Sequence, residues 1–366
     1  MAINAEGKQL YSRTLNVECP PDSTICCDLL DKDIVLPKDK EIVCDIKMVT
    51  KNDTDYADKG HIVAIEQFIL QKFDFSPKPM FAGATFVENE TYYNIKCGKT
   101  EYVLAKNGKI ISAKVDGEER LTAPIRPNFF RATIDNDALP QVPRIIANVI
   151  MGVSAFKNAE KTLRATSIKL DYVDGVAVAD IDWKMRYLKT LHTRYKFGGD
   201  GSIDMEMEVV CIKDLERYGF TWKLTEGIDG IEMYAKGPHE NYCDRATSAK
   251  LGVYKGMSED FIHDYLYPQE NGNHTGVRYI NIGEDKGISL RAVDKSFEAT
   301  IHPYTVQTLL NAKHCHELER EKSLTICVDG KQRGVGGDIP AMANTKPKYK
   351  ILPKQPHELR FVLKFN

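Results

Sequence analysis

The sequence predicts an all-β protein, because short runs of strand-forming residues recur along its 366 residues and turn signals separate them. Residues 202–210 alternate polar and apolar side chains, which is typical of a strand with one solvated face. An Asn-Gly pair at 107–108 and an Asp-Gly pair at 116–117 predict tight turns on either side of the run 110–115. Many short strands with regular turns favour a β-sandwich. Further strands are predicted at 41–49, 288–292 and 323–328.

One segment departs from the strand pattern. Its apolar residues recur at helical spacing, at Val142, Ile145, Ile146, Val149, Ile150 and Val153. Pro143 suits the first turn of a helix. We therefore predict a short amphipathic helix over residues 143–157 that lies on a sheet.

A domain boundary is predicted near residues 72–80, where Pro77 and Pro79 favour an extended connector. Residues 1–75 would form the first domain and residues 76–366 the second. The strand-like sequence before the boundary is shorter than the roughly 100 residues of a full sandwich domain. We therefore expect a small first domain, whether complete or lacking its opening strands.

Composition argues against several classes of partner. The 50 basic and 52 acidic residues leave a net charge of −2, with no basic excess to attract nucleic acid or an anionic membrane. Apolar runs such as 145–153 are far shorter than the roughly 20 residues of a spanning helix, and no signal-peptide pattern follows Met1. The nine scattered cysteines suit small buried residues in a reducing compartment. We expect a cytoplasmic protein without a nucleic-acid or membrane partner.

The densest polar region lies at residues 234–278, with Gly-Pro-His-Glu-Asn-Tyr at 237–242 and Pro-Gln-Glu-Asn-Gly-Asn at 268–273. Hydrogen-bonding side chains beside flat apolar faces suit a surface that contacts sugar. In the structural alternative, Asn241 bonds loop backbone groups while Arg245 bridges to a carboxylate. The candidate residues of this region are His239, Glu240, Asn241, Arg245, Glu270, Asn271 and Arg278.

A second polar run surrounds Phe129 and Phe130. Its candidate residues are Arg126, Asn128, Arg131, Asp135, Asn136 and Asp137. They could form a buried arginine–carboxylate network between two sheets, which requires that every member is paired. They could equally line a cleft.

Six motifs in order make the chain resemble the C-terminal region of the β-galactosidases of glycoside hydrolase family 2. They occupy residues 60–68, 125–137, 237–245, 268–278, 313–318 and 334–338. The resemblance implies an immunoglobulin-like β-sandwich for residues 1–75. For residues 76–366 it implies a large antiparallel supersandwich similar to galactose mutarotase.

The resemblance also implies a parent enzyme that hydrolyses terminal β-D-galactosides in carbohydrate catabolism, with retention of configuration. Retention needs two carboxylates about 5–5.5 Å apart, which in this family are glutamates of an upstream barrel. Such a barrel takes about 250 residues and is not found here, so we assign no catalytic residue. The family's magnesium and sodium sites lie mostly upstream, so we expect no cofactor and no metal in this chain.

The implied partners are a galactoside or other carbohydrate, the catalytic barrel of the same polypeptide, and further copies of the enzyme in a homo-oligomer. We expect the chain to brace the barrel and to shape the rim of the sugar pocket. The alternatives are a free-standing mutarotase-like epimerase and a carbohydrate-binding module.

One segment departs from the family. After the Gly-Gly-Asp of residues 336–338, well-known members carry a tryptophan that stacks on the sugar or aglycone. In this chain the segment 339–344 contains no tryptophan and offers Met342 instead. Losing that stacking surface would weaken aglycone binding by about 1 kcal/mol. Asp338 and Met342 complete the residues expected at the pocket rim.

His314 and His316 would share one face of a strand, and Glu317 follows them. A mutarotase needs a histidine to protonate the ring oxygen and a glutamate to take the anomeric proton, so His314 and Glu317 are candidates for that alternative. In the structural alternative, one histidine is buried and hydrogen-bonded and the other is solvated. A zinc site from His314, Cys315 and His316 is not expected, because the spacing fits no usual ligand pattern.

Overall fold

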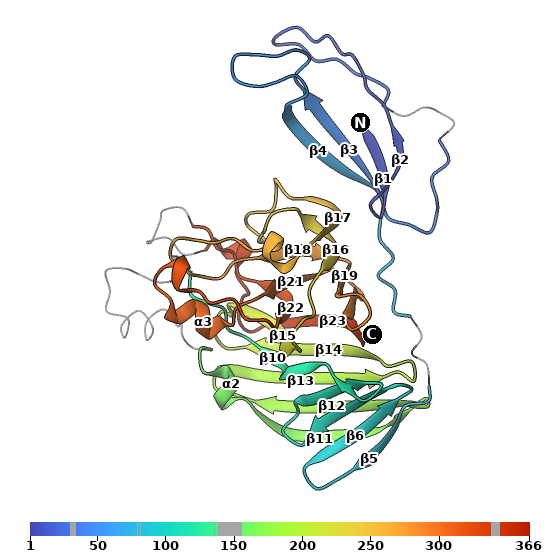
Figure 1. Ribbon diagram of the computed structural model, residues 1–366, viewed down its shortest axis with the longest axis vertical. Coiled ribbons are helices and arrows are strands. Elements are labelled where there is room, and N and C mark those ends of the chain that lie inside the picture. The colour runs from blue at the N-terminus through green and yellow to red at the C-terminus, as the bar shows by residue number, and fades with distance from the viewer. Residues whose placement is uncertain (30–33, 79, 81, 135, 138–155, 338–344) are drawn as a thin grey trace. The chain divides into compact units, whose positions relative to one another are not determined.

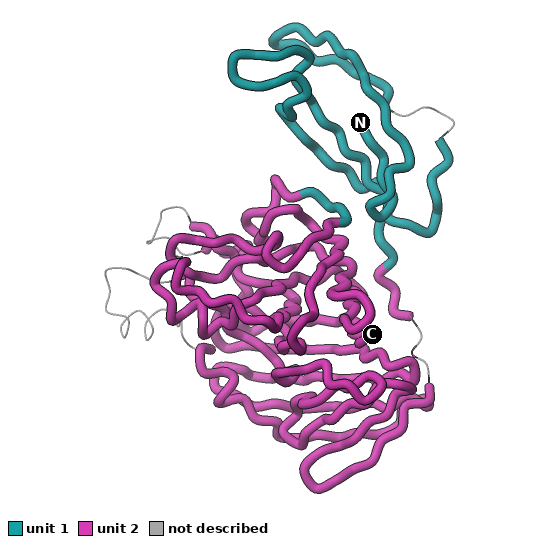
Figure 2. Tube along the Cα trace, in the orientation of Figure 1, with its two compact units in different colours: residues 1–74, 250–253 teal, residues 75–249, 254–366 magenta. Residues whose placement is uncertain are grey.

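The computed structural model describes residues 1–29, 34–78, 80, 82–134, 136–137, 156–337 and 345–366. The chain divides into two compact units, which Figure 2 distinguishes by colour: residues 1–74 with 250–253, and residues 75–249 with 254–366. The predicted helix over 143–157 lies almost entirely outside the described residues, as do Asp135, Asp338 and Met342.

The first unit contains one antiparallel sheet within its described residues, in the order β2-β1-β3-β4. Its strands are β1 (Ala2–Ala5), β2 (Lys8–Ser12), β3 (Ile42–Val49) and β4 (Ile62–Gln71). Glu6 and Gly7 join β1 to β2 with φ values of 45° and 84°, the left-handed conformations of a tight hairpin turn. Ile3, Ala5, Ile42 and Cys44 form its small buried core.

The second unit contains two large antiparallel sheets (Figure 1). The ten-stranded sheet consists, in spatial order, of β18 (Asn273–Val277), β21 (Phe297–His302), β22 (Thr325–Gln332), β15 (Arg217–Leu224), β10 (Leu121–Asn128), β8 (Ile110–Val115), β7 (Thr100–Ala105), β6 (Tyr92–Cys97) and β5 (Thr85–Glu88), with β9 (Glu118–Glu119) beside β8. The nine-stranded sheet consists of β11 (Arg164–Val173), β12 (Val176–Lys184), β13 (Leu188–Phe197), β14 (Ser202–Cys211), β23 (Pro356–Phe365), β20 (Ile288–Ala292), β19 (Tyr279–Ile282), β16 (Ile231–Gly237) and β17 (Lys250–Gly256). Residues 250–253 of β17 are the ones counted with the first unit.

Short helical segments connect some of these strands. They are α2 (Ala159–Thr162) and α3 (Val306–Asn311), with the 3₁₀ turns η1 (Ser258–Phe261), η2 (Cys315–Glu317) and η3 (Pro347–Tyr349). Thr305 caps α3, because its hydroxyl accepts a hydrogen bond from the Thr308 backbone N–H at 3.1 Å. Among the described residues, no helix is long and apolar enough to cross a membrane.

The main core lies between the two large sheets. Phe220 of β15 contacts Phe361 of β23 edge to face, with ring centroids 5.9 Å apart. Tyr218, Trp222 and Leu224 of β15 belong to the same buried cluster. Successive side chains of a strand point to opposite faces, so the residues between these apolar ones lie on the face away from the core. The predicted all-β, antiparallel fold class is confirmed.

Candidate functional site

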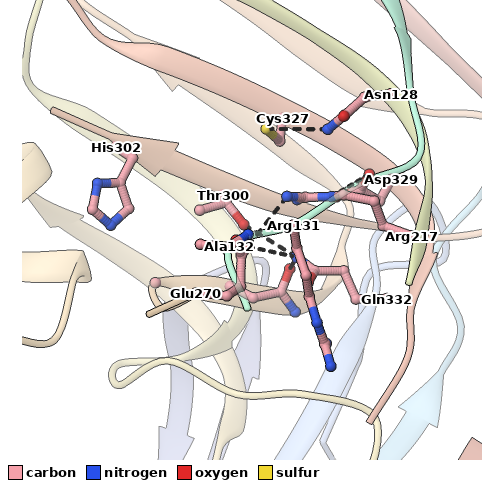
Figure 3. Close-up of polar contacts among 12 residues, drawn as sticks. Asn128, Arg131, Ala132, Arg217, Glu270, Thr300, His302, Cys327, Asp329 and Gln332 are labelled. Atoms are coloured by element: carbon pink, nitrogen blue, oxygen red, sulfur yellow. Dashed lines mark hydrogen bonds and ion pairs between the residues drawn. The ribbon is translucent and has the colours of Figure 1, made fainter. Parts of the chain in front are cut away.

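The face of the ten-stranded sheet that points away from the core is polar. On β15, Arg217 and Thr221 alternate with the core residues, and on β22 Cys327 and Asp329 do the same. On β21 the corresponding residues are Glu298, Thr300 and His302, which are buried although they are polar. We call this surface the polar face, and Figure 3 shows part of it. Because its polar side chains are shielded from water, each needs a partner within the protein.

Arg217 forms the centre of the polar face. Its guanidinium binds both carboxylate oxygens of Asp329, with Nη2 to Oδ2 at 2.6 Å and Nε to Oδ1 at 3.1 Å, and Nη1 reaches Glu270 Oε1 at 3.2 Å (Figure 3). Burial alone would lower the pKa of Arg217, but the adjoining Asp329 carboxylate holds that pKa well above its usual range. Arg217 therefore neutralises Asp329 through a bidentate contact and also binds the carboxylate of Glu270.

Gln332 extends the network beyond Arg217. Its Nε2 lies 3.3 Å from Glu270 Oε1, 3.0 Å from Asn273 Oδ1 and 3.3 Å from Thr300 Oγ1 (Figure 3). Asn273 in turn donates to Glu298 Oε2 at 3.2 Å. Burial raises the pKa of Glu298 to about 7. The carboxylates of this face are therefore bound to neighbouring side chains rather than open to a ligand.

The run 126–137 contributes a second arginine–carboxylate pair. The buried Arg131 donates to both oxygens of Asp137, at 3.2 Å each, and to the Arg333 carbonyl at 2.5 Å. Arg333 also pairs with Asp137. Asn136 Nδ2 donates to the Val335 carbonyl at 2.7 Å. These contacts tie the run to the segment that follows β22. Arg131 and Asp137 form a buried arginine–carboxylate pair, to which the partly exposed Asn136 adds a hydrogen bond, but the pair does not lie in the apolar core between the two large sheets, where the network was expected.

Glu216 lies beside this pair and was not anticipated from the sequence. It is buried, and its Oε2 has no hydrogen-bond partner among the residues that the structure describes. Burial, followed by the charge of Asp137, raises the pKa of Glu216 to about 8. A glutamate in this environment is protonated at neutral pH, which relieves the excess of carboxylates in the network.

Residues 240–241 bind backbone groups of the strands β16 and β18 and of the loop before β18. Glu240 pairs with Arg245, and its Oε2 accepts from the Gly272 N–H at 2.7 Å. Asn241 is fully buried; it donates to the Lys236 carbonyl at 2.9 Å and accepts from the Thr275 N–H at 3.0 Å. The structure thus places these side chains in the contacts of the structural alternative.

Side chains of residues 268–278 also bind other groups of the protein. Asn271 Oδ1 lies 2.9 Å from His302 Nε2, and the Ala132 N–H donates to Glu270 Oε2 at 3.3 Å. Burial lowers the pKa of His302 to about 3, so its imidazole is neutral. Arg278 lies over the Tyr234 ring, with its guanidinium carbon 5.9 Å from the ring centre.

The exposed His239 is separate from this network. Its Nε2 lies 2.9 Å from Ser248 Oγ.

Arg126 and Asn128 line a pocket of about 370 Å³. Thr221 and Lys223 also line this pocket, and residues of α2 and α3 complete it. Arg126 pairs with Glu160 at 2.8 Å, and Asn128 Nδ2 lies 3.8 Å from Cys327 Sγ. The run 126–137 therefore divides in the structure: its start lines a pocket and its end enters the network.

The expectation that His314 and His316 lie in a strand is wrong. His314 precedes the 3₁₀ turn η2, which contains His316 and Glu317, and all three side chains are exposed. The expectation that one of the two histidines is buried is therefore also wrong. Spacing by two residues does not distinguish a strand from a turn when the neighbouring residues are polar. His314 Nδ1 lies 3.0 Å from Glu317 Oε1, and neither residue lines the 370 Å³ pocket.

Sequence reasoning missed the centre of the network. Glu216, Arg217, Asp329, Gln332 and Arg333 lie on or beside strands of ordinary alternating pattern. A charged residue in such a strand usually marks a solvated face. The available signal was weak: Arg217 is the first residue of a strand that the structure buries along nearly its whole length.

The chain is similar to known β-galactosidases along most of its length. Residues 97–363 match the family described as the β-galactosidase small chain, and residues 1–71 match domain 4 of β-galactosidase. A β-galactosidase of Halalkalibacterium halodurans is 28% identical over 376 residues, which cover 99% of this chain and 36% of that protein. A β-galactosidase of Priestia megaterium is 27% identical over 340 residues, which cover 88% of this chain and 31% of that protein.

The chain thus spans about a third of the length of these curated relatives. Among solved structures, a galactose 1-epimerase from Lactobacillus acidophilus covers 78% of this chain and 99% of its own, at 11% identity and a TM-score of 0.43, a likeness too distant to inform function. The small-chain match covers more than half of the residues. The chain therefore belongs to the β-galactosidase small chain family and corresponds to the C-terminal region of a β-galactosidase.

Proposed function

We propose that this chain is a non-catalytic part of a β-galactosidase that hydrolyses terminal β-D-galactosides. The observation that supports this most directly is the state of the carboxylates on the polar face. Glu270 and Asp329 share Arg217 and are buried. Retaining hydrolysis requires two carboxyl groups about 5–5.5 Å apart that both reach the sugar. Carboxylates bound to an arginine and covered by protein cannot serve as nucleophile or acid.

The proposed role of the chain is mechanical: it braces a catalytic barrel and shapes the rim of the sugar pocket. Support comes from the way in which the network holds loops in place. Glu270 binds the Ala132 N–H, and Arg131 binds the carbonyls of Arg333 and Gly334. Loops fixed by buried, charge-assisted hydrogen bonds provide a stiff surface for another domain. Asp338 and Met342 remain predicted rim residues.

The first experiment measures hydrolysis of o-nitrophenyl β-D-galactoside by the purified 366-residue chain, with a full-length relative as the positive control. We expect no turnover above buffer. Turnover that disappears when a glutamate of this chain is replaced by glutamine would overturn the proposal. A trace of activity that no such replacement removes would point to a contaminating enzyme, which a further purification step would separate from the chain.

The bracing role is tested by association. The chain is mixed with the part of the Halalkalibacterium halodurans relative that it does not match, where we expect the catalytic barrel. Co-elution in size-exclusion chromatography, together with hydrolysis that neither part supports separately, is the expected result. If this chain fails to bind that part while the relative's own C-terminal region binds it, the bracing role as proposed is wrong.

Carbohydrate binding is a second candidate function, because Arg126 and Asn128 supply hydrogen-bonding groups to the 370 Å³ pocket. Calorimetry with galactose and lactose would show saturable heat at millimolar sugar. Arg126→Met should weaken that binding, whereas Arg164→Met serves as the matched control, because Arg164 does not line the pocket. An absence of binding heat at millimolar sugar would exclude this candidate.

A further inference from the structure

Three metal-ligating side chains gather on the loop between α3 and β22. Each of His314, His316 and Glu317 offers one ligand atom, and these atoms all lie within 4.8 Å of one another. The two imidazole rings are nearly parallel, with centroids 5.3 Å apart and an interplanar angle of 17°. All three side chains are exposed, so an ion can reach them from solvent. This cluster plays no part in the network on the polar face.

The backbone beneath the cluster is held in place. The Glu317 N–H donates to the His314 carbonyl at 3.1 Å, and the Leu318 N–H donates to the Cys315 carbonyl at 3.1 Å, which closes the turn. The Cys315 N–H donates to the Leu266 carbonyl at 3.2 Å and anchors the turn to a separate loop. Only side-chain rotation is therefore needed to bring the three ligand atoms onto one ion.

Glu317 is already oriented as a ligand. Its Oε2 accepts a hydrogen bond from the Lys313 N–H at 2.8 Å, and its Oε1 lies 3.0 Å from His314 Nδ1. A carboxylate fixed by an outer hydrogen bond is the arrangement that supports ligands in known metal sites. Metal–ligand bonds of about 2.0–2.2 Å place tetrahedral ligand atoms roughly 3.3 Å apart, so the present separations need only a modest closure.

We propose that His314, His316 and Glu317 form a binding site for a divalent transition-metal ion, with Zn²⁺ as the ion that the ligands suit best. Two imidazole nitrogens and one carboxylate oxygen match the ligand set of open zinc sites, which leave a further position for water. From the sequence, a zinc site of His314, Cys315 and His316 was not expected, because the spacing fits no usual ligand pattern. The structure groups Glu317, rather than Cys315, with the two histidines. The sulfur of Cys315 does not belong to the three-residue cluster.

The test uses tag-free protein treated with a chelator. Because the exposed thiols of Cys19, Cys26 and Cys27 could also bind zinc, the host for all measurements carries serine at these three positions. Calorimetric titration with Zn²⁺ should show one ion per chain. His314→Ala and His316→Ala should each weaken binding by at least about tenfold, the loss that even an outer partner of a metal ligand can cause.

Two control variants separate the site from general surface binding. His61→Ala removes an exposed histidine far along the chain and should leave affinity unchanged. Cys315→Ser should also leave it unchanged, because the proposed ligands are nitrogen and oxygen. Circular dichroism of each variant confirms that the fold is retained.

A spectroscopic readout tests the ligands directly. With Cu²⁺ in place of Zn²⁺, electron paramagnetic resonance should show coupling to two nitrogens, reduced to one in His316→Ala. Absence of saturable binding at micromolar metal, or binding that the His314 and His316 variants leave intact, would overturn the proposal.

Discussion

The two large sheets carry the same kind of ion pair in opposite surroundings. On the nine-stranded sheet, Arg194 Nε binds Asp180 Oδ1 at 2.6 Å, and on the ten-stranded sheet Arg217 Nη2 binds Asp329 Oδ2 at 2.6 Å. The side chains of Arg194 and Asp180 are 44% and 31% exposed, whereas those of Arg217 and Asp329 are 1% and 0% exposed. The shortest contact has the same length in both pairs. The buried pair is also bidentate, whereas the exposed pair has a single contact, and the largest difference between the pairs is their burial.

That difference sets the energetic consequences. In the exposed pair, water solvates either partner when the other is removed, and such pairs contribute about 0–1 kcal/mol. In the buried pair, the remaining charge has no water and no partner, which costs about 3–5 kcal/mol. Removing one charge from the polar face should therefore destabilise the protein about as much as a core substitution. Removing one from the exposed face of the nine-stranded sheet should have the small effect of a surface substitution. Both tryptophans, Trp183 and Trp222, lie in the second unit, so their fluorescence reports its unfolding.

The largest effect is expected for Arg217→Met. Methionine is apolar and similar in length to the aliphatic part of arginine. The replacement leaves Asp329 and Glu270 without their shared arginine. We expect the free energy of unfolding to fall by about 3–5 kcal/mol, measured by urea denaturation and tryptophan fluorescence. A loss below 1 kcal/mol would mean that water reaches the polar face, and the contrast between the sheets would then disappear.

The second effect depends on pH and involves Glu216. Burial raises its pKa from 4.5 to about 8, so between these values the folded protein holds a proton that the unfolded chain has released. Stability should therefore fall as pH rises from about 5 to about 8, by up to about 1.4 kcal/mol per pH unit.

Glu216→Gln should flatten that dependence, because glutamine stays neutral at every pH. The matched control is Glu208→Gln, an exposed position on the nine-stranded sheet, which should leave the pH profile of the unfolding midpoint unchanged. Parallel profiles for Glu216→Gln and the unaltered protein would show that Glu216 is ionised in the folded state.

A smaller loss is expected for Asn241→Ala. The replacement leaves the buried Thr275 N–H without its acceptor and the Lys236 carbonyl without its donor. An unsatisfied buried polar group costs about 1–3 kcal/mol, which denaturant titration would detect. His239→Ala, two positions earlier and exposed, provides the comparison and should change stability little. Equal effects of the two variants would argue against a structural role for Asn241.

The smallest effect is expected for Arg194→Met on the nine-stranded sheet. Because both partners are solvated, the free energy of unfolding should change by less than about 1 kcal/mol. Raising the salt concentration should weaken the exposed pair further while leaving the Arg217 pair almost unaffected, since buried charges are poorly screened. A loss for Arg194→Met as large as that for Arg217→Met would refute the role assigned to burial.

Strand prediction succeeded where one face of a strand meets water. The run 202–210 was predicted from its alternation and appears as β14 (Ser202–Cys211), with Met205 and Met207 in the core and Glu208 exposed. The run 126–137 was predicted either as a network between two sheets or as a cleft lining. Its end forms a network that lies outside the apolar core between the sheets, and its start lines a pocket. Prediction failed for His314 and His316, because a polar run at spacing two also fits a turn.

The amino-acid sequence was sufficient to establish the all-β class, the antiparallel strands and the β-galactosidase family, since alternation and ordered motifs are local properties of the chain. It could not identify Arg217, Asp329 and Glu216 as the centre of a buried network. Their strands show which side chains share a face, but not whether loops such as 129–134 cover that face. Covering it removes water, and the loss of water is what separates the Arg217–Asp329 pair from the Arg194–Asp180 pair.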